Sequence, residues 1–97
     1  MMRDDEVLEA SAIEEACLTL EELARAAAVH PQWIARRVEE GYLSAAAGTG
    51  VTHWRFTAAT LRRARRLWGL ERDFDAVPEL AALVADLLEE LERLRAR

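Results

Sequence analysis

The fold is decided by residues 19–72, which read TLEELARAAAVHPQWIARRVEEGYLSAAAGTGVTHWRFTAATLRRARRLWGLER. The first four residues predict a capping box, in which the Thr19 hydroxyl and the Glu22 carboxylate each accept a hydrogen bond from the other residue's free backbone N–H. A helix is therefore expected to begin at Leu20 and to end near Ala28. Its buried face follows helical spacing and is predicted to consist of Leu20, Leu23, Ala24 and Ala27.

Two further helices follow in the same stretch. His30-Pro31 predicts the N-cap and first residue of a second helix, because proline lacks an N–H that would have no partner there. This helix is expected to run to Glu40, where Gly41 ends it, with Ile34, Val38 and Trp33 on its inner face and Leu43 packing just after the turn. Thr57 predicts the cap of a third helix that reaches about Arg72, with Leu61, Ala64, Leu67 and Trp68 at core spacing.

The segment between the second and third helices predicts a wing. Residues 44–52 contain Gly48 and Gly50 and no helical period, which favours a loop. Residues 53–56 alternate like a short strand that returns from this loop.

The last 25 residues, 73–97, predict one long helix. Asp75 is the expected N-cap, Pro78 is tolerated in the first turn, and nothing breaks the helix before Arg97. Leu83 and Leu88 widen its apolar stripe, so the helix is expected to face more than one neighbour. No buried Asn or Lys fixes parallel or antiparallel pairing. The heptad seam predicted to make a homodimer is Val77, Leu80, Val84, Leu87, Leu91 and Leu94.

Taken in order, these elements predict a mostly α chain with three parts. An acidic lead-in over residues 1–17 precedes a winged helix-turn-helix over residues 18–72, and a long C-terminal coiled-coil helix covers residues 73–97. Residues 13–18 are either a short strand or an irregular segment, and the sequence does not decide between the two.

Charge is unevenly distributed along the chain. The net charge of −5 divides into −5 over residues 1–17, +4 over residues 18–72 and −4 over residues 73–97. Acidic ends favour a basic partner over a polyanion. Cys17 is the only cysteine, which excludes an intramolecular disulfide and favours the cytoplasm. No apolar run has the length of a membrane span, and the first residues are too acidic for a signal peptide.

Residue patterns typical of enzymes are absent from the sequence. Adjacent carboxylates such as Glu21-Glu22 and Glu39-Glu40 diverge by about 100° on a helix and do not converge on one substrate. His30 and His53 are far apart, and with one cysteine they make no metal site or nucleophile set. There is no glycine-rich phosphate loop. We therefore expect no enzymatic activity, no metal and no cofactor.

Several short motifs resemble known families. The run 20–25, Val29-His30-Pro31, Glu40-Gly41-Tyr42-Leu43, Trp54-Arg55-Phe56 and Leu61-Arg62-Arg63 resemble the MerR-type winged-helix domain over residues 18–72. Over residues 18–97, which include the ending DLLEELERLR at 86–95, the chain more closely resembles the chaperone-modulator (CbpM) family. This resemblance implies a protein that binds the J domain of a DnaJ/CbpA-type co-chaperone and inhibits its stimulation of the DnaK-type chaperone.

The same resemblance suggests how the acidic C-terminal region would be used. A J domain resembles a basic partner, so carboxylates would attract it, although opposite charge raises the association rate more than the affinity and apolar anchors must also exist. The alternative is that these acids only form the solvated outer face of a coiled coil. The candidate J-domain contacts are Asp73, Asp75, Glu79, Asp86, Glu89 and Glu90, with Glu92 in the same acidic set.

DNA binding is the second hypothesis, through Gln32, Arg36, Arg37 and Arg55. Ala35 stands where MerR regulators have a DNA-contacting arginine, and Glu39 and Glu40 would repel phosphates at the end of the same helix. Nucleic acid is therefore not the expected partner. The cluster Arg62, Arg63, Arg65 and Arg66 is interpreted as a solvated helix face rather than a phosphate site.

Overall fold

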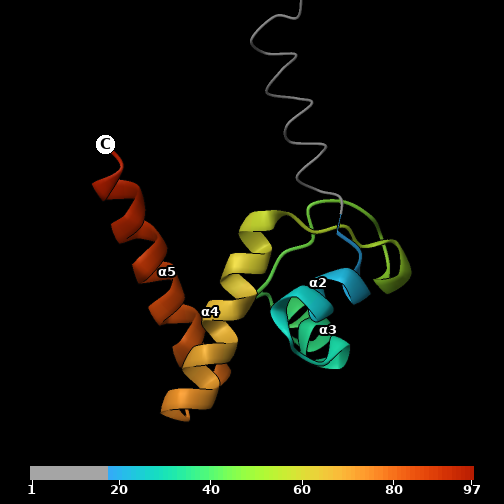
Figure 1. Cartoon of the computed structure of the whole chain (residues 1–97), viewed down its shortest axis with the longest axis horizontal. Coiled ribbons are helices and arrows are strands. Elements are labelled where there is room, and N and C mark those ends of the chain that lie inside the picture. Colours follow the sequence, from blue (N-terminus) through green and yellow to red (C-terminus); the bar gives the residue numbers. More distant parts are fainter. Residues whose placement is uncertain (1–17) are drawn as a thin grey trace, which may run out of the picture.

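The computed structural model describes residues 18–97, so the predictions for the acidic lead-in, for Cys17 and for residues 13–17 lie outside its described part. Residues 18–97 are mostly helical, as predicted, and contain no strand. Their elements, shown in Figure 1, are α2 (Leu20–Ala27), α3 (Pro31–Glu39), the short 3₁₀ helix η1 (Val51–His53), α4 (Ala58–Phe74) and α5 (Pro78–Arg95).

Three predicted helix starts are confirmed. The Thr19 N–H donates to Glu22 Oε1 at 2.9 Å, and the Glu22 N–H donates to Thr19 Oγ1 at 3.2 Å, which completes the capping box of α2. His30 Nδ1 accepts from the Gln32 N–H at 3.2 Å before α3. Thr57 Oγ1 accepts from the Thr60 N–H at 3.1 Å before α4. Each cap satisfies a backbone N–H that has no partner within its helix.

The capping box gives α2 a predictable response to acid. The hydrogen bonds from Thr19 lower the pKa of Glu22 below its ordinary 4.5. A lowered folded-state pKa means that the stabilisation is fully present above the unfolded value and is lost as pH falls through the folded value. We expect Glu22→Gln, which keeps both hydrogen bonds but does not titrate, to make the fall in melting temperature between about pH 5 and pH 3 less steep.

Thermal unfolding followed by circular dichroism across that pH range would measure the difference. Glu21→Gln is the matched control, because Glu21 makes no side-chain hydrogen bond to any of residues 18–97. An equal flattening in both variants would show that the capping box is not the cause.

The junction between α4 and α5 differs from the prediction. Helix α4 continues to Phe74, and Asp75 adopts the left-handed conformation with φ 53° as the C-cap of α4. The prediction that Asp75 is the N-cap of the last helix is therefore wrong. Val77 occupies that position without a side-chain cap, and Pro78 is the first residue of α5. The error has a local cause, because Asp is favoured both at N-caps and in left-handed turns.

The predicted strand over residues 53–56 is also wrong, although the chain does return from the loop as expected. It pairs at isolated positions, Ala47 with Arg55 and Leu18 with Phe56, and η1 occupies the start of the segment. The Arg55 N–H donates to the Ala47 carbonyl at 2.9 Å, and the Phe56 N–H donates to the Leu18 carbonyl at 2.8 Å. The second pairing ties the start of the described chain to the residue that precedes the cap of α4.

Gly48 is the residue on which this loop depends. It has φ +93°, and a Cβ added to it would stand 1.8 Å from the His53 carbonyl oxygen. We expect Gly48→Ala to lower the free energy of unfolding by at least about 2 kcal/mol, because the backbone is strained and η1 must move. Gly69→Ala, inside α4 with no atom within 4 Å of the added Cβ, is expected to raise it by about 1 kcal/mol. Urea unfolding measures both, and equal effects of the two variants would contradict the assignment.

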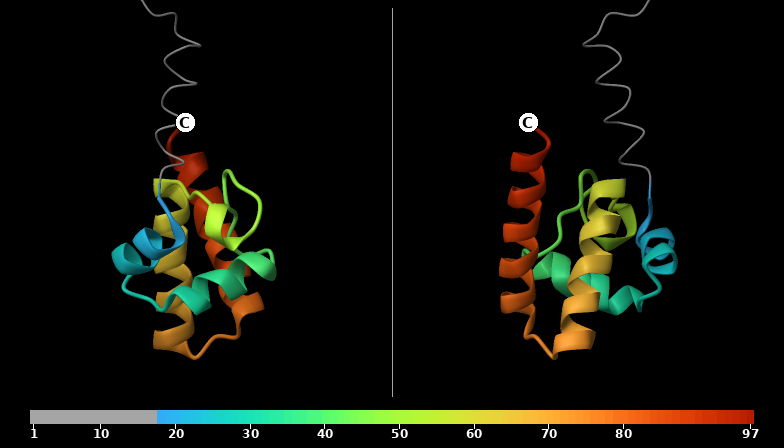
Figure 2. Two further views of the ribbon diagram at one scale, coloured as in Figure 1. Left: turned by 90° about the vertical axis from the view of Figure 1, so that its right-hand side faces the viewer. Right: turned by 60° about the vertical axis from the view of Figure 1, so that its left-hand side comes forward.

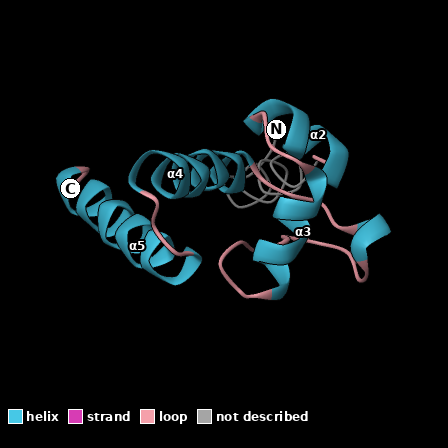
Figure 3. Ribbon diagram, turned by 90° about the horizontal axis from the view of Figure 1, so that it is seen from below, coloured by secondary structure: helices cyan, strands magenta, loops and turns pink. Residues whose placement is uncertain are grey.

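Helix α4 is the central element of the arrangement. It packs against α2 on one side and α5 on the other, while α3 packs against α2 (Figures 1 and 2). The view from below shows α5 on the side of α4 opposite to α2 (Figure 3). All four residues predicted for the buried face of α2 are buried, as are Ile34 and Leu43. The rest of the buried core consists of Phe56, Ala64 and Leu67 with three alanines of α5, Ala81, Ala82 and Ala85.

Candidate functional site

Helix α5 turns its small side chains toward the core and its large ones outward. Its buried residues are alanines, whereas the exposed fractions of its large apolar residues reach 61% at Leu87. Apart from Val84, which is half-buried, the residues of the predicted heptad seam are therefore exposed. We name this surface the α5 stripe; it consists of Val77, Leu80, Leu83, Val84, Leu87, Leu88, Leu91 and Leu94, with Val84 half-buried and the others exposed.

The stripe runs the length of α5 and is unlike an ordinary solvated helix face. Its successive members are one or three residues apart, which places them on one broad side of the helix. Contiguous exposed apolar patches are rare on single soluble chains and mark surfaces that contact another molecule. The stripe is therefore the strongest candidate interaction surface among residues 18–97.

Several of the predicted acidic contacts are engaged within the chain. Arg63 Nη1 lies 2.8 Å from Asp86 Oδ1 and 2.7 Å from Glu89 Oε2, and Arg66 Nη1 lies 2.7 Å from Glu92 Oε1. These ion pairs join α4 to α5, and the hydrogen bond from Arg66 lowers the pKa of Glu92. Their carboxylate side chains keep 44–63% of their surface exposed, so a partner can still approach them.

The other predicted acids fall into two groups. Asp73 pairs with Arg72 at 2.9 Å, which lowers the pKa of Asp73, and Glu90 pairs with Arg93. Asp75 and Glu79 are exposed and form no ion pair with any of residues 18–97. Of the six acids, these two therefore present the least compensated charge.

The arginine cluster of α4 is more than a solvated face. Arg63 Nε donates to the Tyr42 carbonyl at 2.7 Å, and Arg65 Nη2 donates to the Ala26 carbonyl at 2.8 Å. With the pairs to α5, three of the four arginines hold neighbouring segments against α4. Arg62, which makes no hydrogen bond or ion pair with any of residues 18–97, is exposed and lines a hollow beside Ser44.

A groove lies where the N-terminal half of α5 faces the turn that follows α3. It has a volume of about 630 Å³, within the range of pockets that bind ligands. Leu80 and Leu83 supply apolar surface from α5, and Gly41 and Tyr42 line the opposite side. The remaining lining residues are Val77, Ala82, Arg63, Glu79 and Asp86. We call this the α5 groove.

The four candidate DNA contacts differ in how far their side chains are exposed to solvent. Gln32 and Arg36 are exposed on α3 and line a hollow of about 200 Å³. Arg55 is half-buried, and its Nη1 donates to the Trp54 carbonyl at 2.9 Å. Arg37 is 7% exposed and directs its guanidinium into the protein. Glu39 and Glu40 are exposed at the end of the same helix, as the sequence predicted.

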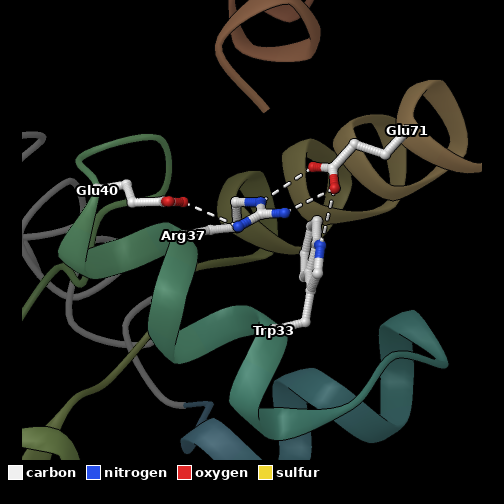
Figure 4. A network of polar contacts seen from close by, with 4 residues as sticks. All are labelled: Trp33, Arg37, Glu40 and Glu71. Atoms are coloured by element: carbon white, nitrogen blue, oxygen red, sulfur yellow. Dashed lines mark hydrogen bonds and ion pairs between the residues drawn. The ribbon is translucent and has the colours of Figure 1, made fainter. Parts of the chain in front are cut away.

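The guanidinium of Arg37 is the centre of a polar network between α3 and α4 (Figure 4). Its Nη2 and Nε donate to the two oxygens of Glu71 at 2.7 and 3.0 Å, and its Nη1 donates to Glu40 Oε1 at 2.8 Å. Trp33 Nε1 also donates to Glu71, at 3.1 Å, and the Arg37 Cζ lies 5.1 Å from the centroid of the Trp33 ring. The hydrogen bonds to Glu71 raise the pKa of Arg37. The network holds α3 against α4. The sequence does not predict it, because Arg37 and Glu71 are 34 residues apart.

Within residues 18–97, each helix is too short or too polar to cross a lipid bilayer. Comparison with known proteins finds no matching family model, no matching curated protein and no matching solved structure.

Proposed function

We propose that this chain is a chaperone modulator, in which α5 joins two copies and the acidic region near α5 binds the J domain of a DnaJ/CbpA-type co-chaperone. By covering the J domain, the dimer would prevent it from stimulating ATP hydrolysis by the DnaK-type chaperone. The modulator itself performs no chemistry in this scheme. The observation that carries the proposal is the exposure of the α5 stripe beside a surface rich in carboxylates.

The surroundings of α3 favour a protein partner over DNA. A winged helix-turn-helix that binds DNA needs cations on its recognition helix, because affinity depends on phosphate neutralisation. Here Arg37 is paired with Glu71 and Glu40, and the exposed Arg36 stands near the exposed Glu39. The scaffold therefore offers little net positive charge where a duplex would dock.

The proposed dimer is tested by placing a charge in the α5 stripe. We expect Leu87→Glu to weaken self-association by about 100-fold or more, since a carboxylate buried without a partner costs several kcal/mol. Thr49→Glu adds the same charge on the exposed wing loop and should leave the dimer unchanged. Sedimentation equilibrium over a range of protein concentrations measures both. A wild-type chain that stays monomeric at about 100 times the concentrations used for binding would refute the dimer.

The proposed activity is tested by titrating the chain with the isolated J domains of its host's DnaJ-type proteins in a calorimeter. The salt concentration should be ~150 mM, where weak surface attraction is largely screened. Saturable binding, together with loss of J-domain-stimulated ATP hydrolysis by the DnaK-type chaperone, is the expected result. No heat with any host J domain would refute the proposed function.

A MerR-like transcription regulator remains the second candidate, and one observation favours it: Gln32 and Arg36 are both exposed on α3 beside the same hollow. This hypothesis requires binding to a preferred DNA sequence with an affinity that falls steeply with salt. Arg36→Ala should then weaken binding, whereas Arg93→Ala, on the exposed end of α5, should not. Selection of bound fragments from random DNA distinguishes the two candidates.

A further inference from the structure

The α5 groove and the predicted dimer seam share Val77 and Leu80 at the start of α5 and separate further along the helix. Glu79, Leu83 and Asp86 are spaced by four and three residues and form one line along α5. Leu80, Leu87 and Leu94 repeat every seven residues and form a second line about 40° around the helix from Leu83, at ~3.6 residues per turn. Because Val84, Leu87, Leu91 and Leu94 do not line the groove, a second copy that packs on this part of the seam can leave the groove open.

The groove carries an excess of negative charge. Arg63, its one cation, already donates to the Tyr42 carbonyl and pairs with Asp86 and Glu89. Glu79 makes no ion pair with any of residues 18–97, and 63% of the Asp86 side chain is exposed. A partner that brings Lys or Arg side chains to this rim would compensate both carboxylates, whereas an acidic partner would be repelled.

The shape of the groove limits how a partner can bind. Residues 18–97 contain no strand at its edges, so a peptide cannot be added there as an extra strand. Tyr42 is its one aromatic lining residue, which is too few for a proline-rich segment that docks between aromatic rings. Apolar side chains of Leu80 and Leu83 beside a charged rim suit an amphipathic helix, whose apolar residues enter a groove at intervals of three and four.

We propose that the α5 groove is the site that holds a basic amphipathic helix of the partner protein. Aliphatic side chains of that helix lie against Leu80, Leu83 and Tyr42, and its Lys or Arg side chains pair with Glu79 and Asp86. This inference rests on the proposed function, because it assigns the J-domain partner to one surface of the chain.

The test uses variants that introduce or reverse a charge on the two lines of α5, with the host J domain as the probe. Leu83→Arg is expected to weaken J-domain binding at least tenfold, and Glu79→Lys is expected to lower the association rate and its dependence on salt. Both variants should keep the wild-type circular dichroism spectrum, since Leu83 and Glu79 are exposed. They should also keep the dimer, since neither residue belongs to the predicted seam. Leu87→Glu, on the seam, should keep an affinity per chain within about twofold of wild type.

Amide chemical shifts give an independent measurement on the full chain. Adding the J domain to the isotope-labelled protein should shift the signals of Gly41, Tyr42 and Leu83, while Gly69 in α4 serves as the unperturbed reference. If wild-type protein binds the J domain but Leu83→Arg binds equally well, the groove assignment is overturned and the proposed function stands.

If the wild-type chain binds no host J domain, the proposed function fails and the groove is tested separately. A synthetic helical peptide of leucine and lysine is then the probe. Shifts at Gly41 and Tyr42 that disappear in Leu83→Arg would support the groove as a site for basic amphipathic helices. Shifts that are absent, or that persist in Leu83→Arg, would overturn it.

Discussion

Glu71→Ala is expected to lower the free energy of unfolding by about 3 kcal/mol, because it leaves the buried Arg37 guanidinium without its main partner. Arg37 is 7% exposed and Glu71 accepts two of its hydrogen bonds and one from Trp33. Water cannot readily replace those acceptors at a side chain so enclosed. Chemical unfolding in urea, monitored by tryptophan fluorescence and circular dichroism, measures the loss.

Two further variants make this expectation specific. Glu40→Ala removes the other carboxylate, whose side chain is 39% exposed, and should cost less than about 1 kcal/mol. The double variant Arg37→Met with Glu71→Leu removes both charges and should recover most of the stability lost in Glu71→Ala, as replacement of buried ion pairs by apolar residues does. Equal losses in Glu71→Ala and Glu40→Ala would show that Glu71 is not the main partner of Arg37.

Phe56→Ala is expected to cost about 4 kcal/mol of unfolding free energy. Phe56 is fully buried, meets the Trp54 ring edge-on with centroids 6.1 Å apart, and exchanges backbone hydrogen bonds with Leu18. Truncation would leave a cavity between the returning loop and the helices, and a small domain has little stability to lose. Thermal unfolding by differential scanning calorimetry measures the effect.

A milder substitution keeps the expectation testable if Phe56→Ala fails to fold. Phe56→Leu retains much of the volume and should cost about 1 kcal/mol. Val51→Ala, at a residue of η1 that is 42% exposed, is the control and should change stability by less than about 0.5 kcal/mol. A loss at Val51 as large as that at Phe56 would mean that the core is centred elsewhere.

Local signals in the sequence predict most of the helix boundaries, because their physical cause is local. The Thr19 and Glu22 side chains bond within one turn, His30 and Thr57 bond backbone groups two or three residues away, and each prediction is confirmed. Asp75 shows where such reasoning fails. The residue type favours two conformations, and packing of α4 against α5 decides between them.

Long-range packing explains what the sequence does not predict. No local sequence pattern predicts the pairing of Arg37 with Glu71. From the sequence alone, an arginine at this position fits a DNA contact as well as a buried ion pair. The leucines of α5 have the spacing of a core face, yet the alanines Ala81 and Ala85 are the residues that meet α4. A small side chain permits a close approach of two helices, and only the position of the neighbour shows which face is used.

All the ion pairs described within residues 18–97, including those that join α4 to α5, have arginine as their cation, and the whole chain contains no lysine. A guanidinium stays protonated far above the point, about pH 10, at which a lysine amine loses its proton. Only the carboxylate of each pair titrates in the range where proteins are handled. These ion pairs therefore respond to pH in one direction only. Acid breaks them by protonating the carboxylate, whereas alkaline solution leaves them intact.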